Sequence, residues 1–131
     1  MNTPYVTPAP SSPVDLACLA QLRSVCQPGE GPTSLAAVVG LFLELSAARL
    51  TEMQQALAAG DAGALRGGAH AVKGSAGLFG ALGLSDLGAE LEEAAGRAAL
   101  DEAGVLLALV EAEMAAVEAV LVQEAGLDRH R

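Results

Sequence analysis

The chain has 131 residues, a formal net charge of −9, 52% apolar residues and 2% aromatic residues. This length suits a single domain, and a core rich in Ala and Leu with few aromatic or β-branched residues favours packed helices. Its seven Lys and Arg residues are too few for a nucleic-acid-binding surface, because phosphate backbones are bound through clustered cations. No apolar run is long enough to span a bilayer. We therefore expect one cytoplasmic domain that binds neither nucleic acid nor membrane.

The two ends of the chain differ in composition from its middle. Residues 1–13 are rich in Pro, Ser and Thr and lack the apolar run of a signal peptide, so they are expected to be a disordered tail of a standalone protein. Residues 14–126 are expected to form the domain, and residues 127–131 a polar C-terminal tail. Because no secretory signal is found, Cys18 and Cys26 are expected to be reduced thiols.

Apolar residues recur at helical spacing from residue 14 to about residue 25, which predicts a short first helix. A loop that contains Pro and Gly follows over residues 27–32. Thr33 or Ser34 is expected to cap a second helix that runs to about residue 59. The expected buried residues of these two helices are Leu16, Leu19, Leu22, Val25, Leu35, Val38, Val39, Phe42, Leu45, Leu50, Met53 and Leu57.

Three more helices are predicted in the second half of the chain. Asp61 is expected to cap a helix over residues 62–79, a fourth helix ends near Gly96, and a fifth spans residues 101–124 before Gly126 stops it. Short connections between consecutive long helices predict antiparallel packing. The predicted fold is all-α, an up-down antiparallel four-helix bundle with an additional short N-terminal helix. The expected buried residues of the last two helices are Leu84, Leu87, Leu91, Ala94, Leu106, Leu109, Val110, Met114, Val117 and Leu121.

The third helix has one apolar face, and His70 lies on the other side. With residues about 100° apart around the axis, His70 is about 140° from the middle of the apolar arc and points into solvent. Several glycines share its side, although a glycine inside a helix costs about 0.5–1 kcal/mol relative to Ala. Their missing Cβ atoms clear room for a partner, so this face is predicted to be a docking surface. The apolar arc consists of Leu65, Ala69, Val72, Ala76 and Phe79, and the glycines are Gly63, Gly67, Gly74 and Gly77.

Lys73 is the single lysine of the chain and follows His70 by three positions, which places its ammonium beside the imidazole. A mobile cation next to a nucleophilic nitrogen suits phosphoryl transfer, where catalysis consists mainly of positioning and electrostatic stabilisation. Ser75 points away from His70 on the same helix and is not expected to contact it. A lone surface histidine such as His130 is usually inert, whereas the combination of His70, Lys73 and the glycines favours a functional site.

One segment of the third helix carries a recognisable motif. Residues 69–81 read AHAVKGSAGLFGA, which resembles the signature of bacterial histidine phosphotransfer (HPt) domains: a histidine followed by x-x-Lys-Gly-Ser, with a glycine ten positions after the histidine. The resemblance covers about residues 35–121 and includes Leu84, Leu87, Leu91 and Glu92. Its departures are mild, such as Val72 in place of the commoner Leu.

The resemblance implies a role for several residues of the motif. His70 is the residue that would be phosphorylated, and Lys73 would support the phosphoryl group electrostatically. Gly80 matches the position that shapes the turn after this helix, and Gly74 matches the glycine that lets a receiver domain approach closely. The expected docking residues are Arg66, Gly67, Gly74 and Gly77.

These features together predict a phosphocarrier rather than an enzyme that uses ATP. Neutral His70 would accept a phosphoryl group from an aspartate of a receiver domain and pass it to another receiver. The resemblance implies response-regulator receivers, a hybrid histidine kinase, or both as partners, and the chain is expected to be a monomer. The resemblance also implies that the Mg²⁺ that assists the reaction belongs to the receiver, so no cofactor is expected on this chain. The sequence contains no P-loop and no glycine box of the histidine-kinase type, which argues against kinase activity.

Two other interpretations remain at the level of the sequence. The chain could be a non-catalytic module that docks receivers through the glycine face, with phosphorylation incidental to its role. A metal-binding bundle is a weaker interpretation, because the expected domain contains a single histidine and no Glu-x-x-His pair faces it.

Overall fold

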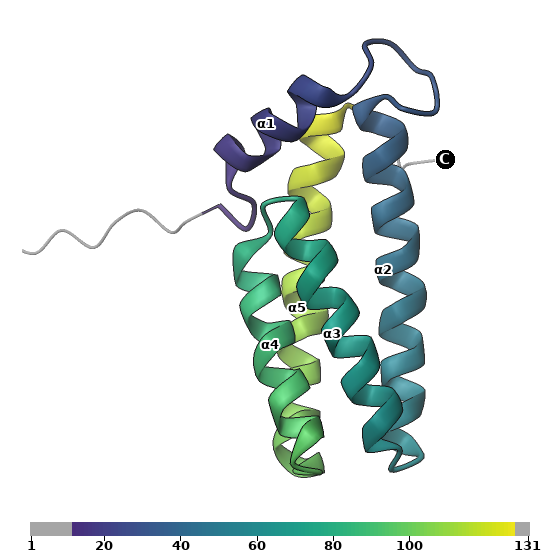
Figure 1. The fold of residues 1–131 in the computed structure, drawn as a ribbon, viewed down its shortest axis with the longest axis vertical. Coiled ribbons are helices and arrows are strands. Elements are labelled where there is room, and N and C mark those ends of the chain that lie inside the picture. The colour runs from purple at the N-terminus through teal and green to yellow at the C-terminus, as the bar shows by residue number, and fades with distance from the viewer. Residues whose placement is uncertain (1–11, 128–131) are drawn as a thin grey trace, which may run out of the picture.

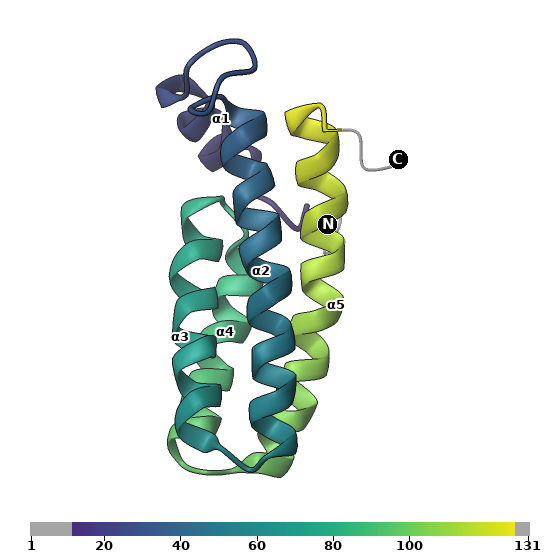
Figure 2. The same ribbon diagram turned by 90° about the vertical axis from the view of Figure 1, so that its right-hand side faces the viewer.

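The computed structural model describes residues 12–127, and this part of the chain consists of helices and connections without any strand. The helices are α1 (Leu16–Val25), α2 (Leu35–Ala58), α3 (Ala62–Leu78), α4 (Leu82–Gly96) and α5 (Leu100–Ala125). Helices α2 to α5 run up and down as an antiparallel bundle, and α1 lies across one end of it (Figure 1). The view turned by 90° shows α3 and α4 as the shorter pair, with α1 above them (Figure 2). The predicted all-α architecture is confirmed.

Side-chain caps begin three of the helices. The Ser34 hydroxyl, one of the two predicted caps of α2, accepts a hydrogen bond from the backbone N–H of Ala37. The Asp61 carboxylate accepts one from the N–H of Ala64, as the sequence predicts. The first helix was expected to begin at residue 14 but begins at Leu16, because the Asp15 carboxylate caps it by accepting from the N–H groups of its first turn. Val14, just before this cap, is fully buried.

The core lies between the four long helices and includes a stacked aromatic pair. The rings of Phe42 and Phe79 lie 4.3 Å apart between centroids, with an interplanar angle of 23°. This contact ties the first half of α2 to the C-terminal end of α3. The fully buried large side chains of the bundle include Leu19, Val39, Met53, Leu65, Leu84, Leu91, Val110, Val117 and Leu121.

Four residues predicted to be buried are exposed instead. Leu45 of α2 and Leu109 of α5 are about half exposed, while Leu43 and Leu107 are buried. Each long helix contacts two neighbours, so the direction of those neighbours decides which of several apolar rows faces inward. Helix α1 packs against the bundle with one side only. Leu19 is buried there, whereas the first and last of the residues predicted to be buried in α1 are exposed. The two exposed end residues are Leu16 and Val25.

Gly80 joins α1 to the turn between α3 and α4. Its φ of +77° lies in the left-handed region, and a Cβ there would stand 2.8 Å from the carbonyl oxygen of Asp15. The carbonyl oxygen of Gly80 accepts a hydrogen bond of 2.7 Å from the N–H of Asp15. At the other end of α1, the Arg23 guanidinium donates to the carbonyl oxygen of Glu124 over 2.8 Å. Gly80 thus shapes the turn, as predicted, and also admits the segment that leads into α1.

The predicted tails fall mostly outside the described residues, so they remain predictions. Cys18 and Cys26 are both free thiols, as expected. Desolvation and the nearby Asp15 carboxylate raise the pKa of Cys18, which favours the protonated thiol. Between residues 12 and 127, no helix is both long enough and apolar enough to span a membrane.

Candidate functional site

His70 lies near the middle of α3, on the side that faces away from the core. Its side chain is 69% exposed, whereas the neighbouring Ala69 is completely buried. The helical period alone produces this contrast, because the core takes one arc of α3 and leaves the opposite arc in water. The predicted exposure of His70 is confirmed.

A carboxylate from the next helix holds the His70 ring. Nδ1 of His70 lies 3.0 Å from Oε2 of Glu92, and the Glu92 side chain is itself only 20% exposed. An ionised carboxylate can only accept hydrogen bonds, so Nδ1 carries the proton and donates a hydrogen bond to Glu92. The neutral ring then has its lone pair on Nε2, the nitrogen without this contact. The contact therefore fixes one tautomer of the ring.

Lys73 reaches the same carboxylate. Its Nζ lies 3.7 Å from Oε1 of Glu92, so one side chain of α4 bridges the histidine and the lysine of α3. The Lys73 side chain is 47% exposed, which leaves its ammonium free to change partners. The expected proximity of Lys73 to His70 is thus present, and Glu92 mediates it.

Gly88 allows α4 to come this close to α3. A Cβ at Gly88 would stand 3.0 Å and 3.1 Å from the backbone N and Cα of Lys73, and 3.2 Å from the carbonyl oxygen of Ala69. The Ser85 hydroxyl donates a 2.8 Å hydrogen bond to the carbonyl oxygen of Lys73, one turn before Gly88. Glu92 follows Gly88 by four residues and so lies on the same side of α4. Backbone contact between the two helices therefore determines where the carboxylate stands.

The glycines around His70 have different surroundings. A Cβ at Gly67 or Gly74 would meet nothing within 4 Å, so these two positions form an open surface beside the histidine. Gly77 instead lies against α4, where a Cβ would stand 3.6 Å from the Ser85 hydroxyl. Gly68 admits α2, because a Cβ there would lie 2.5 Å from Cγ of Met53. Of the four predicted members of the glycine face, Gly67 and Gly74 are thus open to a partner. Gly77 and Gly63 are less so, because a Cβ at Gly63 would stand 3.7 Å from Oδ1 of Asp61.

Arg66 and Ser75, two other residues considered from the sequence, lie apart from the ring. The Arg66 side chain extends over the end of α4, where a Cβ on Gly96 would stand 3.6 Å from its Nε. The Ser75 hydroxyl donates to the carbonyl oxygen of Ala71 over 3.0 Å, as expected of a residue that does not contact His70. In the described part of the chain, no three potential metal-ligating side chains gather into a metal site.

Glu92 is the site residue to which the sequence assigned no role. It lies within the resembling segment, but its contact with His70 joins residues 22 positions apart and depends on the packing of two helices. The available signal was Gly88, a glycine inside a helix with an otherwise apolar buried side. Such a glycine indicates a close helix approach and draws attention to residues one turn away.

Comparisons with known proteins identify the family of the chain. The family model described as Hpt domain matches residues 37–120. The crystal structure of histidine-containing phosphotransfer protein B (HptB) from Pseudomonas aeruginosa PAO1 is similar, with 36% identity and a TM-score of 0.78, over 88% of this chain and 96% of that one. A comparison with curated proteins finds no match. The chain therefore belongs to the Hpt domain family, the histidine phosphotransfer carriers of phosphorelays.

Proposed function

We propose that this chain accepts a phosphoryl group on Nε2 of His70 from an aspartate of one receiver domain and passes it to an aspartate of another. Hpt domains interact with response-regulator receivers and with kinases. The observation that carries the proposal is the contact of Nδ1 with Glu92, which leaves Nε2 as the nucleophilic nitrogen of a side chain that is 69% exposed. A ring that is held in one tautomer and exposed to solvent is oriented to attack the phosphorus of a docked receiver.

The transfer step follows from this tautomer. The Nε2 lone pair forms a bond to phosphorus, and the bond between phosphorus and the aspartyl oxygen breaks, so that its electrons leave with the receiver carboxylate. The proton stays on Nδ1, and the phosphorylated ring is therefore cationic. Glu92, 3.0 Å from Nδ1, stabilises that charge without accepting the proton. Reversal of the step returns the phosphoryl group to a second aspartate.

Lys73 supplies the positive charge for the phosphoryl oxygens. In the resting site its ammonium lies 3.7 Å from Glu92, a loose contact at the protein surface. A phosphoryl group on His70 brings more negative charge than Glu92 and stands on the solvent side of the ring. We propose that the lysine moves from the carboxylate to these oxygens as the phosphoryl group arrives.

The receiver is proposed to dock over the open side of α3. Gly67 and Gly74 offer a surface without side chains next to His70, and Arg66 stands one turn before it. Gly77 contributes a small residue at the α4 border of this surface. We propose that the chain is a carrier without kinase activity, that it needs no cofactor of its own and that Mg²⁺ acts from the receiver.

The test is a transfer assay with a receiver domain that carries a radiolabelled phosphoryl group on its aspartate. We expect acid-labile, base-stable label on the wild-type chain and none on His70→Gln. The matched control is His130→Gln, which changes the other histidine and is expected to keep the label. Label that persists in His70→Gln would contradict the proposal. Binding of the receiver without label on any variant would favour a non-catalytic docking module instead.

A further inference from the structure

Two arginines of the described chain have no acidic partner. Arg23, Lys73 and Arg97 each lie within 4 Å of a carboxylate, but neither Arg49 nor Arg66 does so within residues 12–127. The formal net charge of the chain is −9, so carboxylates are abundant on its surface. A guanidinium left without one of them is available to a carboxylate from another molecule.

Arg49 stands at the border of an apolar groove between α2 and α3. The groove has a volume of about 270 Å³, and Arg49 is the one charged residue that lines it. Its walls include Leu41, Leu45 and Leu78, which are 56%, 52% and 65% exposed, and the α3 residues Ala71 and Ser75. Exposed leucines gathered around one hollow are unusual on a monomer surface and mark a place where another protein docks.

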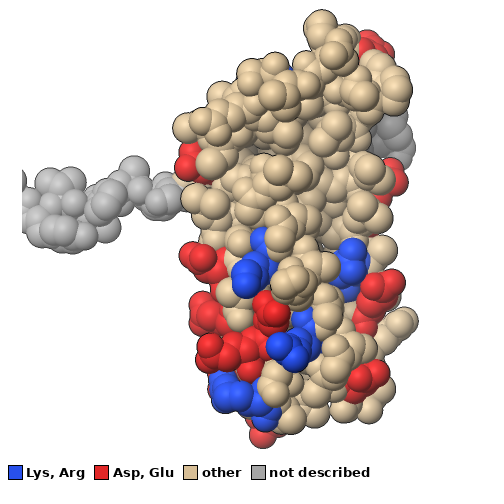
Figure 3. Space-filling view, in the orientation of Figure 1, with Lys and Arg blue, Asp and Glu red and all other residues tan. Residues whose placement is uncertain are grey.

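The groove continues the surface around His70. Around the axis of α3, the open position Gly74 lies between His70 and the groove residue Ala71. On the face shown in Figure 3, the basic side chains gather mainly in the lower half, and the upper half is mostly uncharged. A partner that covers His70 and extends toward α2 therefore meets a surface without side chains, apolar walls and a cation.

Arg49 lies on the opposite side of His70 from Lys73. A Cβ at Gly68 would stand 3.9 Å from Cδ of Arg49, so the stem of the arginine lies against the α2 side of α3. Lys73 and Glu92 occupy the α4 side. This position separates Arg49 from the Nε2 chemistry and directs its guanidinium toward a molecule docked in the groove.

We propose that Arg49 selects the receiver: it pairs with a carboxylate on a receiver helix whose apolar side fills the α2–α3 groove. The inference rests on the proposed function and names the chemistry of the partner that it requires. Docking removes water from the groove, and a guanidinium that loses water without gaining a carboxylate is strongly disfavoured. The planar fork of arginine matches a carboxylate in two parallel hydrogen bonds. Receivers with a neutral or basic residue at this point are therefore rejected.

The first experiment measures receiver binding and phosphoryl transfer for Arg49→Met and Arg49→Glu. With a receiver that labels the wild-type chain, we expect the Kd to rise about 10-fold for the methionine variant and about 100-fold for the glutamate variant. Labelling of His70 by phosphoramidate, a small donor that needs no docking, should stay at the wild-type rate in both. Circular dichroism and thermal melting check that both variants fold.

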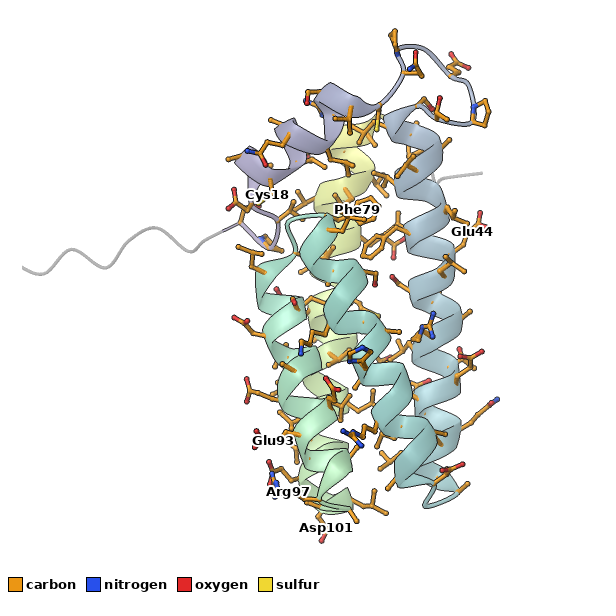
Figure 4. All side chains as sticks on the ribbon, in the orientation of Figure 1. Cys18, Glu44, Phe79, Glu93, Arg97 and Asp101 are labelled. Atoms are coloured by element: carbon orange, nitrogen blue, oxygen red, sulfur yellow. The ribbon has the colours of Figure 1, made fainter. Side chains whose placement is uncertain are left out.

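The matched control is Arg97→Glu, which makes the same change in net charge. Arg97 lies at the opposite end of the bundle from Phe79, a residue that lines the groove (Figure 4). It is a surface residue paired with Glu102, and we expect less than about a twofold change in Kd. An equal loss in this control and in Arg49→Glu would mean that overall charge decides binding, and would overturn the proposal.

A charge reversal on the partner completes the test. Exposed Asp and Glu residues of the receiver are changed to Arg one at a time, and one such variant should bind Arg49→Glu at least about 10-fold better than the unchanged receiver does. Unchanged receiver affinity in Arg49→Glu, with normal labelling of the wild-type chain, would refute the role of Arg49. Self-association of the chain that only Arg49→Glu abolishes would assign the groove to a second copy. Wild-type protein that neither donor labels at His70 would refute the proposed function instead.

Discussion

The two sides of α3 are built in opposite ways. Toward α4, helix packing is close, and the polar groups satisfy one another: Glu92 holds His70 and Lys73, and Ser85 binds the α3 backbone. Toward α2, the surface beside the histidine is open, the groove is apolar, and Arg49 has no acidic partner among the described residues. The groups for phosphoryl transfer are therefore positioned by contacts within the chain, whereas the groups for recognition need contacts with another molecule.

Removal of Lys73 is expected to have the largest effect on the α4 side. In Lys73→Ala the phosphoryl oxygens lose their cation, and the transfer rate from a receiver should fall about 100-fold, which corresponds to about 2.7 kcal/mol. The fold should be intact, because the side chain is half exposed and packs nothing in the core. Rapid-mixing transfer kinetics measure the rate, and Lys73→Arg should retain much of it. Equal rates in Lys73→Ala and wild type would show that the electrostatic role is wrong.

Forcing α4 away from α3 is expected to cost stability as well as function. In Gly88→Val the new Cβ would stand only 3.0 Å from the backbone N of Lys73, and the two methyl groups need further space. We therefore expect a loss of about 2 kcal/mol in the free energy of unfolding. The same displacement separates Glu92 from His70, so transfer should slow. Urea denaturation measures the stability. A variant as stable as wild type would mean that the close contact does not constrain the two helices.

Neutralising the bridging carboxylate is expected to have a smaller effect. In Glu92→Gln the amide oxygen can still accept from Nδ1, but the negative charge that stabilises the cationic phosphorylated ring is lost. We expect transfer to slow about 10-fold, equivalent to about 1.4 kcal/mol. The neighbouring Glu93→Gln, at an exposed position, is the control and should transfer at the wild-type rate. Glu92→Gln and Glu93→Gln with the same rate would remove Glu92 from the mechanism.

The smallest effect is expected for Gly74→Ala on the open side of α3, and this substitution should raise the stability of the chain instead of lowering it. A Cβ at Gly74 meets nothing within 4 Å, so Gly74→Ala should stabilise the chain by about 0.5–1 kcal/mol through helix propensity alone. The added methyl group nevertheless stands where a receiver is proposed to dock, so receiver-dependent labelling should slow while labelling by phosphoramidate does not. Thermal unfolding and the two labelling rates test both halves. Faster receiver-dependent labelling would place the docking surface elsewhere.

Local signals in the sequence determined most of the helices. The sequence predicts Thr33 or Ser34 and Asp61 as caps, because a side-chain oxygen can satisfy the first free N–H groups of a helix without help from the rest of the fold, and the structure selects Ser34 and Asp61. The exposure of His70 followed from the 3.6-residue period of α3 in the same way. In a strongly amphipathic helix, the apolar period identifies the buried and the exposed residues without any knowledge of the neighbouring helices.

The tertiary structure alone decided which side chains of different helices meet. Leu45 and Leu109 were expected in the core, yet the neighbours of α2 and α5 lie along other apolar rows and leave both exposed. Glu92 reaches His70 because Gly88 allows α4 to touch the α3 backbone, and the distance and register of two helices are not encoded in the period of either one. The helical period of the sequence is therefore sufficient to predict that His70 faces water beside glycines and a lysine. Packing decided that a carboxylate orients its ring, and that beside it lies an apolar groove whose arginine has no acidic partner among residues 12–127.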